Sequence, residues 1–478
     1  MTTARIDDAA ETLVIAGTGP RPSSAELIGP RASVAARITG GGKTWKATVP
    51  LRASRWGGPE LPLPAGDYEI RIPGVDLGGL ALAPEVLSGV RIAVRGGTAV
   101  IAAPVDPAYE TPEGQATLEG RYLAHAGGTE NAVFFESFYG RTVGCNPQAI
   151  DRALAAAAPA VVRYWSVADL SVAVPHGAIA VVEGSPEWWR ARASVRLLVV
   201  NDWLRRRFAR KPGQKVLQTW HGTPLKRLAL HRPGFDLRRM AAVVKESRRW
   251  DVLLAQNAYS ERILRKAYAF FGRPIWVEGY PRDDVLVTGD AAAIRADLGI
   301  GADERVLLYA PTWRDDRAAM VDFVDAEALA RQTDSVVLVR GHSRTIDTDR
   351  DRAGARVIDV TGYPETSKLL LAADALITDY SSVMFDFSVT GKPMFFLVPD
   401  LDHYRGQLRG FYFDLESRAP GPLVRSQEEL VTALADPTLT EAFAQRYAAW
   451  RAQFNTRDDG HAAERVVARI LDQGYVTR

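Results

Sequence analysis

The sequence predicts an α/β protein in which a small all-β module precedes two Rossmann-like domains. Three observations support this fold class. The chain has 478 residues, more than one hydrophobic core usually organises. Its first hundred residues hold short segments in which apolar and polar positions alternate, whereas the remainder holds short apolar runs separated by stretches with helical spacing. Hydrophobic residues make up 47% and charged residues 24% of the chain, which excludes a largely disordered protein.

Residues 1–106 are predicted to form a β-sandwich-like accessory module. The segments TLVIAG, SVAARIT, YEIRI and VRIAVRG alternate in polarity as half-buried strands do, and Gly, Pro and Asp separate them. Residues 107–120, PAYETPEGQATLEG, are polar and contain Pro and Gly, so we interpret them as a linker.

Residues 121–282 and 283–478 are predicted to form an N-terminal and a C-terminal Rossmann-like domain. The first contains the apolar runs AVFFES, RLLVVND, KVLQTW and VLLAQN, and the second contains VLLYAP, VVLVRG, ALITDY and PMFFLV. Stretches with helical pattern separate these runs, and such alternation is typical of parallel sheets covered by helices. The tail at 440–473 has helical spacing, and we expect it to pack on the body.

The net charge and the cysteine content exclude some classes of protein. The net charge is only +2, so no global field marks a nucleic-acid binder. Basic clusters at 205–215 and 238–249 suit phosphates or anionic headgroups, or else a solvated helix face. The single cysteine, Cys145, excludes an internal disulfide framework and fits a reducing compartment. Neither a signal peptide nor an apolar run of about 18 residues occurs, so we expect no export and no membrane span.

The segment QTWHGTPLKRL at 218–228 is the first candidate site, because it follows a predicted buried strand. His221 suits a general base, since imidazole titrates near neutral pH; the alternative is a structural hydrogen-bonding histidine. Gly222 permits a sharp turn, and Lys226 adds positive charge. Thr223 completes the candidate substrate-binding residues of this segment.

Two segments of the second half suggest anion binding. In YAPTWRDD, Thr312 and Arg314 follow a strand, and Arg314 suits a phosphate clamp unless a neighbouring aspartate holds it. In VVLVRGHSR, Arg340 and His342 surround a glycine after another strand, which favours an anion site.

The segment ALITDYSSVMFDF at 375–387 completes the predicted site. Asp379 follows the strand, and Ser381 and Ser382 precede a helical pattern, so their hydroxyls and the first-turn amides would converge on an anion such as pyrophosphate. Ser381 also suits an N-cap, which is compatible with that role. No Walker A, G-x-G-x-x-G or H-E-x-x-H motif and no dense carboxylate cluster occurs, so we predict neither a metal nor a cofactor.

Taken together, these motifs resemble the CDP-glycerol:poly(glycerophosphate) glycerophosphotransferases of teichoic-acid synthesis. The resemblance covers residues 131–414 and rests on FFESFYGRTVGCNP, LQTWHGTPLKRL, YAPTWRDD, RGH, TGYPETSKLLLAADALITDYSSVMFDF and GKPMFFLVPDLDHYRGQLRGFYFD. It implies a GT-B arrangement, with two Rossmann-like domains facing a cleft. It further implies that His221 is the catalytic base and His342 a second catalytic histidine. The donor-site positions that it implies are Thr312, Arg314, Ser381, Ser382 and Asp386.

The resemblance also implies a reaction and partners. The terminal hydroxyl of a lipid-linked glycerophosphate acceptor would attack the β-phosphorus of CDP-glycerol and release CMP, with CDP-glycerol as substrate and no cofactor. Such an enzyme would work as a peripheral protein at the cytoplasmic face of the membrane, and residues 205–215 are candidates for that contact. No nucleic acid is expected as partner, and self-association stays open.

Several alternatives stay open at the level of sequence. The donor is CDP-glycerol, CDP-ribitol or, for a GT-B glycosyltransferase, a sugar nucleotide. A non-catalytic scaffold that binds polymer is the alternative from another class. The sequence does not separate a primase from a polymerase, and the β pattern of the first hundred residues lies outside the part that carries the resemblance.

Overall fold

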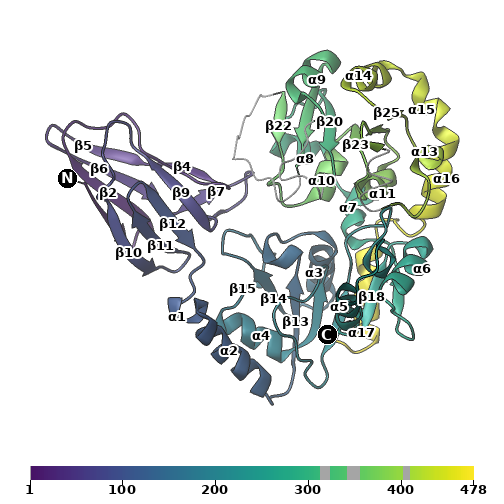
Figure 1. Ribbon diagram of the computed structural model, residues 1–478, viewed down its shortest axis with the longest axis horizontal. Helices are drawn as coiled ribbons and strands as arrows, with labels where there is room; N and C mark the ends of the chain where they lie inside the picture. The colour runs from purple at the N-terminus through teal and green to yellow at the C-terminus, as the bar shows by residue number, and fades with distance from the viewer. Residues whose placement is uncertain (1, 313–322, 342–355, 402–409) are drawn as a thin grey trace.

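The computed structural model describes residues 2–312, 323–341, 356–401 and 410–478, and every statement below concerns these residues. They form an N-terminal β module and two α/β domains (Figure 1). The β module stands to one side of the α/β domains, and its short strand β7 lies at the end that faces them.

Two antiparallel sheets build the β module. One has the strand order β1 (Thr2–Asp7), β2 (Thr12–Thr18), β6 (Thr44–Pro50), β5 (Arg37–Gly41). The other has the order β10 (Ala81–Val86), β11 (Arg91–Arg95), β12 (Thr98–Ala102), β9 (Gly66–Arg71), β3 (Glu26–Ile28), β4 (Ser33–Ala35). A hairpin of β7 (Arg52–Ser54) and β8 (Glu60–Pro62) is separate from both. Alternate residues such as Leu13, Ile15, Tyr68 and Ile92 point into one shared core, as the alternating sequence pattern requires.

The segment at 107–120, interpreted above as a linker, is helical. It forms α1 (Pro107–Glu110) and most of α2 (Pro112–Ala124). The two prolines that suggested a linker occupy the first helical position, where the missing N–H costs nothing. The side chains of Asp106 and Thr111 cap the two helices by accepting from the amides of Ala108 and Gly114. The connection is therefore made of capped helix.

The first α/β domain contains a parallel sheet with the order β15 (Ile179–Val182), β14 (Val162–Val167), β13 (Glu130–Glu136), β16 (Val195–Val200), β17 (Lys215–Gln218), β18 (Val252–Ala255), β19 (Ile275–Val277). Its helices are α3 (Cys145–Ala157), α4 (Pro186–Ser194), α5 (Leu237–Ser247) and α6 (Ala258–Ala267). The central strands are buried on both faces, which explains their continuous apolar sequence.

The second α/β domain contains a parallel sheet with the order β22 (Val357–Asp359), β21 (Ser335–Val339), β20 (Arg305–Ala310), β23 (Ala375–Thr378), β24 (Met394–Leu397), β25 (Leu423–Val424). Its helices are α7 (Asp284–Thr288), α8 (Ala291–Asp297), α9 (Ala326–Thr333), α10 (Thr366–Ala372), α11 (Val383–Phe387), α13 (Leu415–Arg418), α14 (Gln427–Ala435), α15 (Thr438–Ala442) and α16 (Ala444–Phe454). The predicted α/β class with parallel sheets is thereby confirmed.

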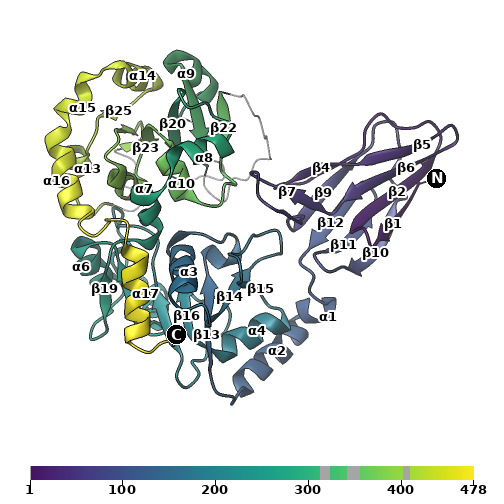
Figure 2. The ribbon, with the colours of Figure 1, turned by 180° about the vertical axis from the view of Figure 1, so that it is seen from behind.

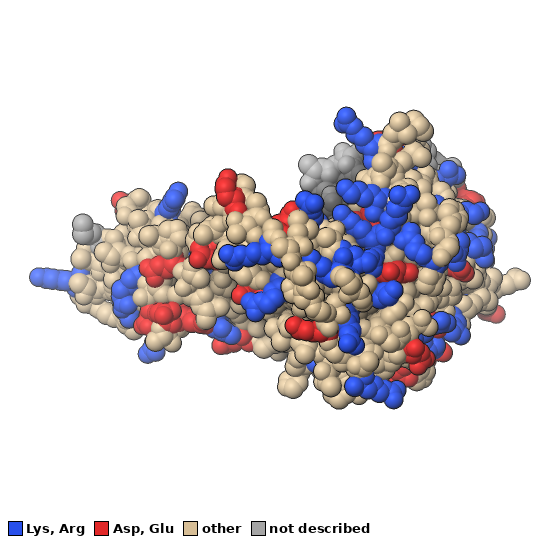
Figure 3. All heavy atoms as spheres, turned by 90° about the horizontal axis from the view of Figure 1, so that it is seen from below, with Lys and Arg blue, Asp and Glu red and all other residues tan. Residues whose placement is uncertain are grey.

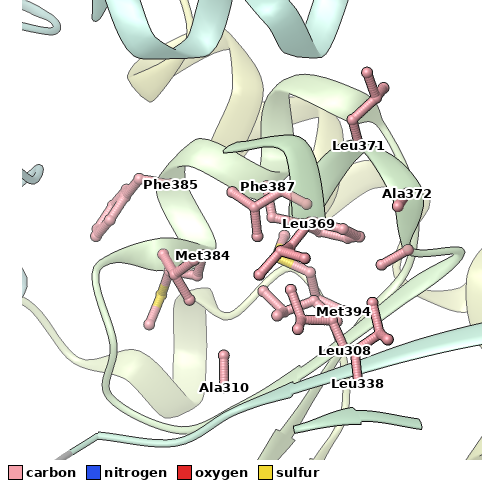
Figure 4. Packing of buried hydrophobic residues seen from close by; sticks show 14 of the residues in the cluster. Leu308, Ala310, Leu338, Leu369, Leu371, Ala372, Met384, Phe385, Phe387 and Met394 are labelled. Carbon is pink, nitrogen blue, oxygen red and sulfur yellow. The ribbon is translucent and has the colours of Figure 1, made fainter. Parts of the chain in front are cut away.

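A core cluster beneath α10 and α11 fixes the loop that follows β23. Leu369 and Ala372 of α10 and Met384 and Phe387 of α11 pack over Leu308 of the sheet (Figure 4). Because these side chains are buried, α11 begins at a defined place, and the serines before it have a defined position.

The last helix, α17 (Ala462–Asp472), leaves the second α/β domain and returns to the first. It lies beside α3 (Figure 2), and its residues Val466, Val467 and Ile470 belong to the same core cluster as Leu154. The predicted C-terminal tail therefore packs on the body, with α17 on the α/β domain that is farther from it in sequence.

Candidate active site

A cleft with a volume of about 1280 Å³ lies where the three units meet. It is lined by residues that follow the carboxyl ends of parallel strands in both α/β domains, namely Phe138 after β13, His221 after β17, Pro311 after β20 and Ser381 after β23. Ligands bind at this edge of open α/β sheets. The β module closes part of the rim with the tip of its β7–β8 hairpin.

His221 stands on a tight turn directly after β17. Trp220 adopts a left-handed backbone with φ 55°, and the Gln218 side chain accepts from its amide at 2.9 Å. The Asn146 amide donates to the carbonyls of Thr219 and Trp220, both at 3.2 Å. The imidazole stacks on the Trp220 ring with 4.8 Å between centroids. These contacts fix the ring at the cleft wall.

One hydrogen bond determines which nitrogen of His221 can act as a base. Nδ1 lies 2.7 Å from the Asn201 carbonyl oxygen. Since a carbonyl oxygen only accepts, Nδ1 carries the proton, and Nε2 of the neutral ring has the free lone pair. Burial lowers the pKa of His221, while the Asp202 carboxylate opposes that shift. His221 is therefore neutral at physiological pH, as a general base must be.

Arg282 joins the two α/β domains immediately behind His221. Its Nη2 donates to both oxygens of Asp386 on α11 at 2.8 Å. Its Nη1 donates to the His221 carbonyl at 2.9 Å and lies 3.2 Å from the Cys145 sulfur. Asp386, predicted as a substrate-binding residue, thus uses both carboxylate oxygens to hold Arg282. Nothing in the sequence singles out Arg282, because its partners His221 and Asp386 lie far from it along the chain.

A network of buried polar groups continues from this pair. Gln256 donates to Asp283 at 3.2 Å and to Asp458 at 2.9 Å. Burial, with Asp386 nearby, raises the pKa of Asp283 well above its ordinary value, and burial raises the pKa of Asp458 to about 7. We call Gln256, Arg282, Asp283, Asp386 and Asp458 the interdomain junction.

Two predicted substrate-binding residues of the first segment lie elsewhere. The Thr223 side chain is buried, and its hydroxyl bonds to Gln256 and lies 3.1 Å from the Ser260 hydroxyl, so it supports the interdomain junction instead of facing the cleft. Lys226 forms a backbone bridge with Phe411 and is not among the residues that line the cleft. The motif at 218–228 does not show which of its residues face the cleft. The structure shows that the chain leaves the cleft after Gly222, so Thr223 and Lys226 lie away from it.

At Gly222 the two α/β domains are in close contact beside the cleft. A Cβ at this position would lie 2.6 Å from the Ser382 hydroxyl oxygen, so only glycine leaves room. Ser381 and Ser382 both line the cleft. The Ser381 hydroxyl accepts from the Val383 amide at 3.4 Å, but Ser382 occupies the N-cap position of α11, so the predicted N-cap lies one residue too early. The structure therefore brings His221, Gly222, Ser381 and Ser382 together, as the sequence suggested.

Asp379 and Arg340 stabilise loops at the cleft. The Asp379 carboxylate accepts from the Thr312 amide at 2.9 and 3.0 Å, which positions the loop after β20. Arg340 lines the cleft, but its Nη1 donates to the carbonyls of Val360 and Tyr363 at 2.9 and 3.0 Å. Burial lowers the pKa of Arg340 to about 10.

Two predicted residues, Arg314 and His342, lie outside the described residues, so their predicted roles stay predictions. Within the described ranges, no group of three or more His, Cys, Asp or Glu side chains is placed to hold a metal ion.

The basic run at 205–215 is not a free cationic surface. Arg205 and Arg206 pair with Glu183, Arg207 with Glu119 and Arg210 with Asp251, while Lys211 donates to the carbonyls of Tyr122 and Leu123. The proposed use of this run for membrane contact loses its support, because these cations already neutralise acids or satisfy carbonyls. The basic cluster is visible in the sequence, but its acidic partners Glu183, Glu119 and Asp251 are not, because they lie on other elements.

Comparison with known proteins identifies relatives of the chain. A family model described as CDP-Glycerol:Poly(glycerophosphate) glycerophosphotransferase matches residues 122–472. A teichoic acid glycerol-phosphate transferase of Staphylococcus aureus (strain NCTC 8325 / PS 47) is 36% identical over 370 residues, which is 72% of this chain and 93% of the relative. A teichoic acid poly(glycerol phosphate) polymerase of Bacillus subtilis (strain 168) is 36% identical over 365 residues, and the match spans 71% of this chain but only 48% of that polymerase.

Solved structures show the same similarity. The structure of the wall teichoic acid polymerase TagF superimposes with a TM-score of 0.67 at 31% identity, covering 72% of this chain and 90% of that one. A TagF variant soaked with CDPG gives a TM-score of 0.68 at 29% identity, covering 76% and 98%.

Proposed function

Since the chain belongs to the CDP-glycerol:poly(glycerophosphate) glycerophosphotransferase family, it is a glycerophosphotransferase, and we propose that its cleft transfers glycerol phosphate from CDP-glycerol to a lipid-linked polyol-phosphate acceptor. The observation that carries this assignment is the Nδ1 hydrogen bond of His221, which leaves Nε2 unprotonated at the cleft wall. The two parallel-sheet domains around this one cleft support a GT-B arrangement.

In the proposed reaction His221 Nε2 takes the proton from the terminal hydroxyl of the acceptor. The hydroxyl oxygen forms a bond to the β-phosphorus of CDP-glycerol, the bond from that phosphorus to the bridging oxygen breaks, and CMP leaves. Ser381 and Ser382 reach the cleft from the opposite domain and would donate to the donor phosphates. Arg282 positions His221 by donating a hydrogen bond to the backbone carbonyl of His221, and Arg282 itself does not need to touch substrate.

The test measures CMP release and product mass with purified protein, CDP-glycerol and a lipid-linked glycerophosphate acceptor. His221→Ala is expected to lower kcat by about 10²–10⁴-fold, the usual contribution of a general base. His461→Ala, which removes an exposed histidine, is the matched control. Parallel assays with CDP-ribitol and a sugar nucleotide identify the donor. Full activity of His221→Ala would contradict the assignment of the base.

We also propose peripheral binding at the cytoplasmic face of the membrane through the loop before α5. Phe235 is 81% exposed and Leu237 66% exposed, which is unusual for such large apolar side chains. Arg232 and Arg238, which are close to them in sequence, are exposed. Apolar side chains among cations suit an anionic bilayer surface. Figure 3 shows one face on which basic side chains gather over the larger part of the molecule, with acidic ones between them.

No helix in the described part of the chain has the length and hydropathy needed to cross a bilayer. The measurement that tests surface binding is flotation with anionic vesicles. Phe235→Ser with Leu237→Ser should abolish flotation, whereas Arg207→Ala, in the paired run at 205–215, should leave it unchanged. Equal flotation of all three proteins would refute this contact.

A further inference from the structure

The β module contributes directly to the wall of the cleft. Its Arg31 forms an ion pair with Asp169 of the first α/β domain at 2.7 Å, and the Ala65 amide donates to the same carboxylate at 3.0 Å. Arg55 donates to the Ser171 carbonyl at 2.8 Å. We call these contacts, together with those of Trp56 described next, the module junction.

Trp56 extends the module junction to the second α/β domain. Its ring meets Tyr363 edge to face with 5.6 Å between centroids. Trp56 has a left-handed backbone with φ 55°, a strained conformation for a bulky residue, and Gly57 follows with φ 66°. The indole nitrogen lies beside Gly362 and has no hydrogen-bond partner among the described residues. The hairpin tip therefore presents an N–H donor at the rim of the cleft, between the two domains.

The cations that line the cleft differ in whether they have partners. Arg31 pairs with Asp169, Arg282 with Asp386, and Arg152 and Lys368 share Glu365, while Arg55 and Arg340 donate to carbonyls. Arg141 is exposed in the cleft, and its guanidinium has no acidic or carbonyl partner in the part of the chain that the structure describes. A guanidinium left free in a cleft can bind phosphate.

The loop that carries Arg141 is held in an unusual conformation. Phe138, Tyr139 and Gly140 have consecutive φ values of 47°, 59° and 73°. The Phe138 amide donates to the Asn201 side chain at 2.9 Å, and the Tyr139 hydroxyl donates to Asp202 at 2.7 Å. A Cβ on Gly140 would lie 2.9 Å from the backbone of Ala168. Strain of this kind persists only where the surroundings enforce it, and here it places Arg141 in the cleft.

Arg141 lies on the same side of the cleft as the catalytic base. Phe138, which begins its loop, meets His221 with 5.7 Å between ring centroids, and Gly140 accepts from the Ala168 amide at 2.8 Å. Ala168 is followed at once by Asp169, where the β module attaches. Ser381 and Ser382 reach the cleft from the other α/β domain. Since the base must meet the acceptor hydroxyl, the wall that carries Arg141 is on the acceptor side.

We propose that Arg141 and the Trp56 indole N–H form a subsite for a phosphate of the polyol-phosphate acceptor chain. This inference rests on the proposed function, in which the acceptor hydroxyl lies at His221. A phosphodiester of the acceptor chain needs a cation and a hydrogen-bond donor, and Arg141 and the Trp56 indole are two residues of the same cleft that supply them. The β module is thereby an acceptor-binding part of the enzyme.

The experiment compares steady-state constants for both substrates. Arg141→Ala is expected to raise the acceptor KM about ten-fold or more, the effect of losing one charge-assisted hydrogen bond, with the CDP-glycerol KM unchanged. Arg141→Lys should recover part of the loss. Trp56→Ala should raise the acceptor KM by about two- to ten-fold, and Trp56→Phe should not restore it, because phenylalanine has no N–H. Arg121→Ala, an exposed arginine of α2 outside the cleft, is the matched control.

The outcomes separate this inference from the proposed function. Failure of the unmodified protein to release CMP with acceptor and CDP-glycerol would refute the function itself. Normal turnover of the unmodified protein with an unchanged acceptor KM in Arg141→Ala would refute the subsite. A rise in the CDP-glycerol KM alone would move Arg141 to the donor site and also refute it. A thermal unfolding curve that matches the unmodified protein shows that each variant is folded.

Discussion

The interdomain junction and the module junction both border the cleft, yet they are built differently. The interdomain junction is buried: Asp283 and Asp386 are 0% and 4% exposed, and the bidentate Arg282–Asp386 pair lies within it. The module junction consists of the Arg31–Asp169 ion pair, whose side chains are 22% and 4% exposed, the hydrogen bond from the Ala65 amide to the same carboxylate, the hydrogen bond from the Arg55 side chain to the Ser171 carbonyl, and the aromatic contact of Trp56. The two ion pairs are similarly buried, since the Arg282 and Asp386 side chains are 14% and 6% exposed, but only the interdomain pair adjoins a network of further buried polar groups, Gln256, Asp283 and Asp458. The first junction therefore holds His221 through many coupled contacts, whereas the second is held by a few separate ones.

Arg282→Ala tests this difference most severely. It leaves the Asp386 carboxylate buried without its cation, and such a loss costs about 3–5 kcal/mol. We expect a large fall in the thermal unfolding temperature together with loss of CMP release, because the His221 carbonyl loses its donor as well. Differential scanning calorimetry measures the first effect. An unfolding temperature within a degree or two of the parent protein would show that the pair contributes little.

Asp169→Ala should have a smaller and local effect. It removes the acceptor of Arg31 and of the Ala65 amide, which together are worth about 1–3 kcal/mol. Limited proteolysis should then release the β module faster, while hydrogen exchange in β16 and β17 stays unchanged. Arg71→Ala, which breaks an exposed pair within the module, is the control. If β16 and β17 exchange faster too, the module is part of the same cooperative unit as the α/β domains.

The two junctions should respond to pH in opposite directions. The pKa of Asp458 is raised to about 7, so its stabilisation is complete below its unfolded value of 3.8 and is lost as the pH rises through about 7. The pKa of Asp169 is lowered: burial opposes this shift, but Arg31 and hydrogen bonds outweigh it. Its stabilisation is present above the unfolded value and is lost as the pH falls.

One titrating proton changes stability by at most about 1.4 kcal/mol per pH unit, so the change across any single pH unit is small compared with the loss of the Arg282–Asp386 pair. Hydrogen exchange at β18 and η3 (Pro281–Asp283) should speed up between pH 6 and pH 8 beyond the intrinsic dependence of the amides, and Asp458→Asn should flatten that response. Exchange that is equally steep in Asp458→Asn would assign the response to another group.

The sequence predicted regular elements well and long-range pairs poorly. The strands before His221 and Ser381 are apolar runs of a few residues, which local pattern identifies. The helices at 107–124 lie in a segment whose polar, Pro- and Gly-containing composition is typical of a linker, although Asp106-Pro107 and Thr111-Pro112 are sequence signals for a helix start. Arg282 and Asp386 are 104 positions apart, and no periodicity connects them. The left-handed backbone of Phe138 and Tyr139 was beyond prediction, because aromatic residues disfavour it and only tertiary contacts enforce it.

The return of α17 to the first α/β domain affects how the chain folds during synthesis. Val466, Val467, Ile470 and Val476 fill the face of the first domain that includes Leu154 and Leu197. A ribosome has to translate the whole second α/β domain before these residues leave the exit tunnel. Until then the first domain exposes an uncovered apolar face, so it cannot reach its final state as an independent unit. The α/β domain that carries His221 is therefore the first of the two to be synthesised and the last to complete its core.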